Sequence, residues 1–211
     1  AVISMGCDTS FFGKEHYKEN LFGQGDKKVI LFVGRLAEKK GVTYLIEAMK
    51  YINDAILVIA GDGPLKEELT QQAEKMCKEK QCECIKFIGA KTHEQLRSIY
   101  ASSDIFVMPS ITAKDGDKEG FGLVMLEAFA SGLPVIASRS GGIVDLVKDS
   151  INGCLVEEKD IKGIANKINI VLNNERIYNK LVMAARSTAE QYDYKVIAKK
   201  YNDFIDKVIK E

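Results

Sequence analysis

The sequence predicts an α/β fold: a Rossmann-like, doubly wound parallel sheet of about six strands with a C-terminal helical extension. Short β-rich apolar runs alternate with amphipathic stretches, which is the pattern of βαβ units. Most of these runs are apolar throughout, as expected for strands that helices cover on both faces. With 46% apolar and 28% charged residues, the 211-residue chain can form a proper hydrophobic core.

Six strands are expected, in order at 29–33, 56–60, 85–88, 105–108, 135–137 and 154–156. Between the first three, two stretches repeat apolar residues at helical spacing, as in Val42, Leu45, Ile46 and Met49, and in Leu65, Leu69, Ala73 and Met76. Thr92 begins the next helix, with Gln95 in the position of a capping box. After Asp160, three helical stretches follow without an intervening strand.

Three regions are predicted along the chain. Residues 1–28 show no clear element, and their glycines suggest a loop that leads into the first strand. Residues 29–172 form the Rossmann-like domain, and residues 173–211 form the helical extension. No internal repeat or low-complexity linker divides the chain further.

Charge and hydropathy exclude several classes of protein. The 30 basic and 30 acidic residues give a formal charge of zero, which argues against nucleic acid or an anionic membrane as a partner. The longest apolar run, 55–60, is too short to span a bilayer. The first residues lack the basic and apolar regions of a signal peptide. We therefore expect a cytoplasmic location.

The five cysteines are odd in number and irregularly spaced, and a chain of this size needs no disulfides. Cys82 and Cys84 form a C-x-C pair, with Cys77 nearby. Reduced structural thiols are expected, with a zinc site as the alternative.

Ligands of open parallel sheets bind outside the carboxyl ends of the strands. After the first strand, Gly34, Arg35 and Lys40 occupy such a loop. Two long cations near a helix N-terminus can hold a diphosphate, and the alternative is solvated surface charge. Gly61, after the second strand, either lets a ligand approach or forms a plain turn.

The loop after the fourth strand is the most informative. Glu119-Gly120-Phe121-Gly122 leads into an apolar helix that Glu127 interrupts. A carboxylate among apolar neighbours is costly to bury without partners, so Glu127 should face a polar ligand or a cation. Such a site could hold a diphosphate at the helix start, a sugar at Glu119 and a second polyol at Glu127.

Two metal interpretations compete for this loop. Asp115, Asp117 and Glu119 begin like a calcium loop, but position twelve is Leu126 and not an acid. Asp115 and Asp117 also have D-x-D spacing, which a surface loop easily yields by chance. We expect no metal and no cofactor.

The loop after the fifth strand carries Ser138 and Gly141-Gly142, which form either a further backbone contact to phosphate or sugar, or a tight turn. Neither histidine, His16 nor His93, falls in any of these loops. The sequence therefore predicts no histidine base.

Seven segments in order, VGRLAEKKG, IAGDGP, IKFIGA, DIFVMPS, EGFGLVMLEAFASGLPVIAS, GGIVDLV and NGCLV, resemble a known family over nearly the whole chain. They are similar to the C-terminal, donor-binding domain of retaining glycosyltransferases with the GT-B fold, of the glycosyl transferases group 1 type. The Glu-x7-Glu spacing of Glu119 and Glu127 belongs to the same pattern. One departure is Val144-Asp145 after Ile143, where the family has a Pro or similar residue followed by Glu.

The resemblance implies a role for each candidate residue. Arg35, Lys40 and Glu119 would be the catalytic group, with the two cations on the donor diphosphate and Glu119 on the donor sugar. Glu127 would accept hydrogen bonds from the ribose hydroxyls. The remaining donor-binding positions would be Gly34, Gly61, Phe87, Ile88 (the last two beside the base), Gly120, Phe121, Gly122, Leu123 and Val124. Cations and a helix dipole could then stabilise the leaving diphosphate without a metal.

The resemblance also implies what lies outside the chain. MGCDTSFF resembles the segment just after the crossing from an N-terminal domain, and AEQYDYKVIAKKY resembles the closing helix that returns to it. The chain would then be half an enzyme, inactive alone, which transfers a hexose from a UDP- or GDP-sugar to a hydroxyl acceptor. A saccharide or lipid-linked saccharide is the expected acceptor, and the absent domain could attach the protein peripherally to a membrane.

Two other functions stay open. The first is a non-catalytic α/β module that binds a nucleotide or a protein partner. The second is a domain of a sugar-nucleotide epimerase of similar two-domain build.

Overall fold

A computed structural model describes residues 3–13, 20–23 and 25–210. It confirms the predicted fold class: a six-stranded sheet in the order β3-β2-β1-β4-β5-β6, with every neighbouring pair parallel. The strands are β1 (Lys28–Val33), β2 (Ala55–Ala60), β3 (Ile85–Gly89), β4 (Ile105–Met108), β5 (Val135–Ser138) and β6 (Cys154–Val156). All six lie at the predicted positions.

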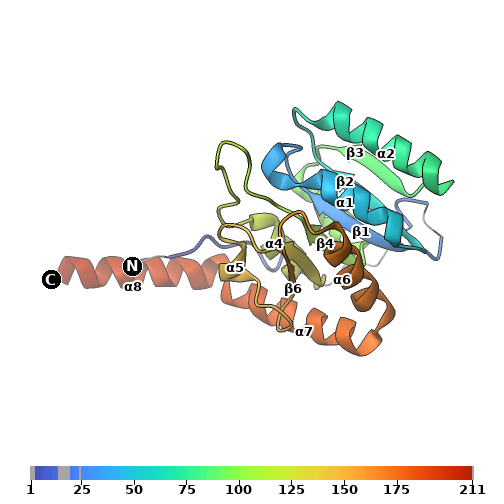
Figure 1. Cartoon of the computed structure of the whole chain (residues 1–211). Coiled ribbons are helices and arrows are strands. Elements are labelled where there is room, and N and C mark those ends of the chain that lie inside the picture. The colour runs from blue at the N-terminus through green and yellow to red at the C-terminus, as the bar shows by residue number, and fades with distance from the viewer. Residues whose placement is uncertain (1–2, 14–19, 24, 211) are drawn as a thin grey trace.

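Helices connect the strands and close the chain (Figure 1). They are η1 (Glu38–Lys40), α1 (Val42–Ala48), η2 (Met49–Tyr51), α2 (Lys66–Lys80), α3 (His93–Ala101), α4 (Leu123–Ala130), α5 (Ile143–Leu146), α6 (Ile161–Asn173), α7 (Glu175–Gln191) and α8 (Tyr194–Lys210). The capping box at Thr92 is confirmed, because its side chain accepts from Gln95 N and the Gln95 side chain accepts from Thr92 N.

Alternate residues of each strand face two separate hydrophobic clusters, because side chains along a strand point to opposite faces. Ile30 and Phe32 of β1 face a cluster built with α1, α2 and α6. Leu31 and Val33 face the other cluster, built with α3, α4 and part of α7. Helices therefore cover the sheet on both faces, as the apolar strands predict.

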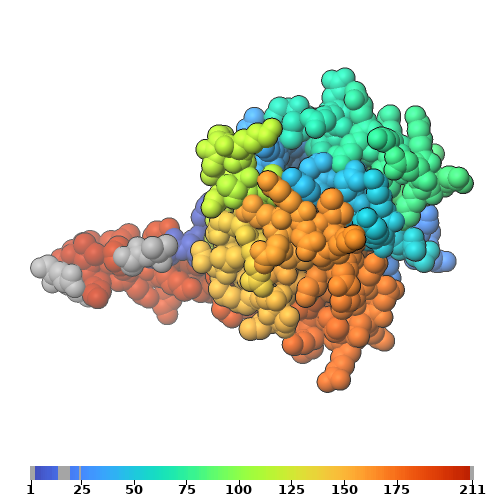
Figure 2. Space-filling model, viewed as in Figure 1, coloured from blue at the N-terminus to red at the C-terminus, as the bar shows by residue number. Residues whose placement is uncertain are grey.

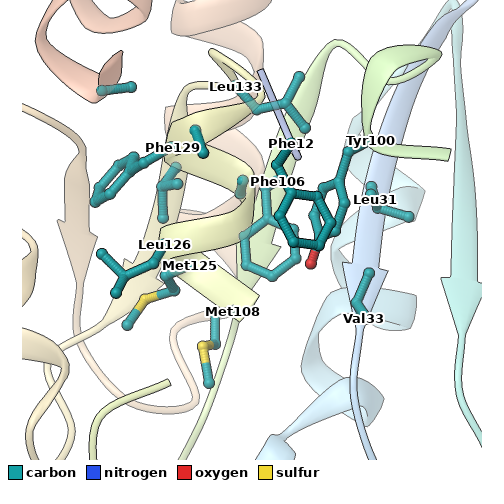
Figure 3. Close-up of a cluster of buried hydrophobic side chains, with 14 of the residues drawn as sticks. Phe12, Leu31, Val33, Tyr100, Phe106, Met108, Met125, Leu126, Phe129 and Leu133 are labelled. Atoms are coloured by element: carbon teal, nitrogen blue, oxygen red, sulfur yellow. The ribbon is translucent and has the colours of Figure 1, made fainter. Parts of the chain in front are cut away.

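The cluster under α3 and α4 is rich in aromatic rings (Figure 3). Tyr100 packs edge-on against Phe12, with 5.6 Å between ring centroids, and lies 6.0 Å from the ring of Phe106. Phe12 lies well before the first strand in sequence, and its ring is part of the core on this face of the sheet. The same cluster supports the helix that carries Glu127.

The last two helices differ in their packing. α7 buries Leu181, Ala185 and Ala189 in the core, whereas α8 projects from the body of the domain (Figures 1 and 2). Ile197 of α8 is buried, and most of its other large apolar side chains are exposed. The predicted boundaries at 28/29 and 172/173 remain predictions.

The chain near its start pairs with the junction between α7 and α8. Cys7 N donates to the carbonyl of Tyr192 (3.0 Å), and Tyr194 N donates to the carbonyl of Cys7 (3.1 Å). Further along, the Tyr201 hydroxyl donates to the carbonyl of Ile3 at 3.3 Å. The two segments that the resemblance associates with a domain crossing thus lie side by side. Of the helices in the described part of the chain, none is long and apolar enough to span a bilayer.

Truncating a core ring should cost much of the fold's stability. Phe129 of α4 is fully buried, and Phe129→Ala should lower the free energy of unfolding by about 3–5 kcal/mol, through lost burial and a residual cavity. Urea unfolding followed by circular dichroism measures this loss. Met183→Ala on α7, where the side chain is 74% exposed, is the control and should change stability by less than about 0.5 kcal/mol. Equal losses in the two variants would contradict the assignment of the core.

Candidate functional site

Loops from different strands meet at the carboxyl edge of the sheet. Beyond the strand ends, Gly34 N donates to Ala60 O (3.0 Å) and Gly61 N donates to Gly89 O (2.9 Å). These amides extend the ladder of the sheet, so they are not available to a ligand. Gly34 and Gly61 therefore contribute close backbone packing, and a contact between either residue and the donor stays a prediction.

The loop after β4 is held from both sides. Ile111 N donates to Lys39 O at 2.8 Å, and Gly142 N donates to Glu119 O at 3.0 Å. A Cβ on Gly142 would overlap the carbonyl oxygen of Gly120, so this residue must be glycine for the two loops to approach. These main-chain contacts thus fix the position of the Glu119 backbone, from which its side chain extends.

Two of the predicted catalytic residues form an ion pair. Lys40 ends η1, Glu119 lies just before α4, and their Nζ and Oε2 atoms are 2.5 Å apart. The two side chains are only 13% and 11% exposed. The sequence brings these loops to one edge of the sheet, and the structure adds that the two charges contact each other directly.

Arg35 lies in a neighbouring pocket of about 280 Å3, which Gly34, Gly61 and Leu96 also line. Arg35 follows Gly34 just after β1, whereas Lys40 lies further along the chain at the end of η1. The structure thus places the two predicted cations at the end of the same strand, and the Lys40 side chain passes close to Gly34, which lines the Arg35 pocket.

Glu127 is buried, and its hydrogen-bond partner in the structure is Tyr100. The side chain is 7% exposed, and its Oε2 accepts a hydrogen bond of 2.9 Å from the Tyr100 hydroxyl, which also donates to Val124 O (3.2 Å). Burial raises the pKa of Glu127, while the Tyr100 bond and the charge of His93 oppose the shift. Burial and the Glu127 charge also raise the pKa of Tyr100 well above its ordinary value.

Glu127 faces a pocket of about 300 Å3 that joins distant parts of the chain. Leu123 of α4 and His93 of α3 line it, together with Cys7 and Tyr194 from the crossing of the chain's two ends. Burial and then the nearby charge of Glu127 raise the pKa of Cys7 to about 12, so its thiol stays protonated at neutral pH. This pocket is open, concave and mostly apolar with a carboxylate in its wall, as small-molecule sites usually are.

His93 falls in none of the candidate loops, yet the structure places it beside Glu127, and the absence of a histidine base stays a prediction. His93 begins α3 and lines the same pocket as Glu127, because α3 packs beside α4 on one face of the sheet. His16 lies outside the described residues. The sequence does not predict His93 and Tyr100 as site residues, because they belong to a helix and not to a loop after a strand. The one available signal was that a buried carboxylate needs a polar partner.

The remaining predicted donor-binding residues are distributed around the start of α4. Gly120 to Gly122 precede the helix, and Leu123 and Val124 open it, where the first N–H groups lack helical acceptors. The ring of Phe121 turns to Tyr192, with 5.8 Å between centroids. Phe87 and Ile88 lie within β3. Phe87 packs against the cluster of α1 and α2, so only Ile88 shares the face of α3 and α4.

Within the described residues, no group of three or more His, Cys, Asp or Glu side chains could hold a metal ion. All five cysteines are free thiols. In the D-x-D segment, Asp117 pairs with Lys39 at 2.9 Å, and its backbone N–H donates to Asp115 Oδ1 at 2.9 Å. Metal independence stays a prediction.

Comparison with known proteins gives relatives over most of the chain. It is 35% identical over 190 residues to an uncharacterized glycosyltransferase of Methanocaldococcus jannaschii, covering 88% of this chain and 46% of that protein. It is 34% identical over 173 residues to a GDP-mannose-dependent alpha-(1-6)-phosphatidylinositol monomannoside mannosyltransferase of Mycolicibacterium smegmatis, covering 80% and 44%. The chain thus spans about half the length of these relatives.

A solved structure supports the fold. The crystal structure of HepE from Anabaena in complex with UDP superposes with a TM-score of 0.86 at 22% identity, over 98% of this chain and 57% of that one. The family model for glycosyl transferases group 1 matches residues 13–188. From this match, and from relatives aligned over most of its length, the chain belongs to the group 1 glycosyltransferases.

Proposed function

We propose that this chain is the donor-binding half of a retaining glycosyltransferase. It binds a UDP- or GDP-sugar, and the completed enzyme transfers the hexose to a hydroxyl acceptor. The observation that carries the proposal is the shielded Lys40–Glu119 pair, whose carboxylate lies just before α4, with the buried carboxylate of Glu127 inside that helix. The cation can bind a phosphate group, and the two carboxylates can accept hydrogen bonds from hydroxyl groups. This set of side chains suits a ligand in which a diphosphate lies between two groups that carry hydroxyls.

In the proposed reaction, the bond between the sugar C1 and the donor diphosphate breaks, the acceptor hydroxyl oxygen bonds to C1 on the same face, and the hydroxyl proton passes to the leaving diphosphate. Negative charge then grows on the leaving diphosphate. Lys40, Arg35 and the N–H groups at the start of α4 would stabilise that charge, since groups fixed before the reaction need no reorganisation. Glu119 would hold the sugar, and Glu127 would accept from the ribose. This set of charges supports a transfer without a metal.

The relatives support a nucleotide-sugar donor but do not indicate whether its nucleotide base is uracil or guanine. One uses GDP-mannose by its name, and crystal structures of HepE hold UDP and UDP-glucose. Because the chain covers about half of its relatives, we assign acceptor binding to a further N-terminal domain. A saccharide or lipid-linked saccharide is the proposed acceptor, and the cytoplasm is the proposed location, with membrane attachment through that further domain.

Calorimetric titration of the chain with UDP and with GDP tests donor binding. We expect one of them to bind, and Lys40→Ala and Glu127→Ala each to weaken binding at least about tenfold, because each removes a charged hydrogen-bonding partner. Lys50→Ala on η2, which removes a cation that pairs with Glu47 and lines neither of the two pockets described above, is the control. If neither nucleotide binds, or if the site variants bind as tightly as the control, the proposed function is wrong.

Glu127→Gln should stabilise the fold and weaken nucleotide binding. The folded-state pKa of Glu127 is raised by burial, so the folded protein holds this proton more tightly than the unfolded chain, and ionisation lowers stability as pH rises through that range. Removing the charge should therefore raise the melting temperature at pH 7 and weaken nucleotide binding. The gain should vanish at about pH 4, below the ordinary glutamate pKa, where Glu127 is largely protonated in both states.

Glu47→Gln is the matched control, since Lys50 lowers the pKa of this α1 carboxylate. It should give no gain in melting temperature at pH 7 and leave nucleotide affinity unchanged. If the Glu127→Gln protein has a lower melting temperature than the parent at pH 7, the charged form of Glu127 does not destabilise the fold, and the prediction is wrong.

A further inference from the structure

Lys40 and Glu119 form the most shielded ion pair of the described part of the chain. Their side chains are 13% and 11% exposed, whereas the neighbouring pair, Lys39 with Asp117, is 31% and 53% exposed. Solvent-exposed pairs contribute little because water and salt screen them. The Lys40–Glu119 attraction is screened far less, so separating the two charges requires a replacement partner for each.

The two loops that carry the pair are themselves fixed. Lys39 O accepts from Ile111 N and Glu119 O accepts from Gly142 N, and a Cβ on Gly41 would overlap the carbonyl oxygen of Pro109. Because main-chain bonds and close packing hold both loops, the pair can open by rotation of the side chains without movement of the loops.

Donor binding, as proposed above, uses both members of this pair. A diphosphate takes Lys40 and leaves the Glu119 carboxylate shielded and without its cation. A buried anion without donors is unfavourable. The hydroxyls of a sugar attached to the diphosphate can donate to Glu119, whereas a nucleoside diphosphate without the sugar offers nothing at that position.

We propose that Glu119 is a specificity-determining residue that discriminates the nucleotide-sugar donor from the free nucleoside diphosphate, by competing with the diphosphate for Lys40. When the diphosphate takes Lys40, the hydroxyls of an attached sugar can replace it by donating hydrogen bonds to Glu119. A free nucleoside diphosphate has no sugar at this position, so Glu119 is left without a partner. Glu119 thereby weakens binding of the leaving product relative to the substrate. This inference rests on the proposed function, because it assumes that a diphosphate reaches Lys40.

The test measures affinities of the 211-residue chain for UDP and UDP-glucose, or for GDP and GDP-mannose if only guanosine nucleotides bind. Glu119→Gln and Glu119→Ala should each bind the free diphosphate more tightly, by about three- to tenfold, because Lys40 is no longer occupied. The same variants should bind the nucleotide sugar no more tightly than the parent. The ratio of the two affinities therefore falls.

A double-mutant cycle with Lys40→Met separates competition for Lys40 from a general loss of negative charge. In the Lys40→Met background, removing Glu119 should no longer tighten diphosphate binding by the same factor. Asp117→Asn is the matched control, since it removes one acid from the same loop and leaves Lys40 paired. It should change diphosphate affinity less than about twofold, as expected for a screened exposed charge.

Three results would overturn the inference while leaving the proposed function intact. They are unchanged or weaker diphosphate binding in both Glu119 variants, equal tightening by Asp117→Asn, and full tightening in the Lys40→Met background. A parent chain that binds neither nucleotide overturns the proposed function and the inference together. Circular dichroism of each variant verifies that a loss of binding is not a loss of fold.

Discussion

At the carboxyl edge of the sheet, main chain packs directly on main chain, and the geometry of the site depends on this constraint. Gly41 lies against Pro109 and Gly142 against Gly120, too close for a side chain between them. Parallel strands bring these loops to one edge, but only glycine at the crossings lets the loops touch. Lys40 and Glu119, each next to such a crossing, are thereby held within contact of each other.

Next to these loop contacts, the candidate site has a carboxylate at a buried position, where a residue with only a packing role would be apolar. Glu127 is buried in an otherwise apolar helix, and burial raises the pKa of Glu127 instead of a salt bridge lowering it. Its partner, Tyr100, belongs to the aromatic cluster that also includes Phe12 and Phe106. The candidate site is thus built on the aromatic core, and it holds a carboxylate whose burial is unfavourable to its charged form.

The sequence predicts the strands well because strands buried on both faces must be apolar throughout, and the runs around Leu31 and Val107 show this directly. It also predicts which strand ends carry charged side chains. It does not predict contacts between elements, which depend on how α3 and α4 pack. His93 and Tyr100 were missed for that reason, and Phe87 faces away from the cluster of α3 and α4 because the strand alternates faces. The ion pair of Lys40 and Glu119 also requires knowledge of the loop crossings.

A crystal structure of the chain with UDP or GDP bound would show whether a diphosphate displaces Glu119 from Lys40. We expect a phosphate oxygen on Lys40 Nζ, a broken Lys40–Glu119 contact, and a ribose hydroxyl on Glu127. A nucleotide bound elsewhere on the surface, or bound at this edge with the Lys40–Glu119 pair still closed, would contradict this expectation.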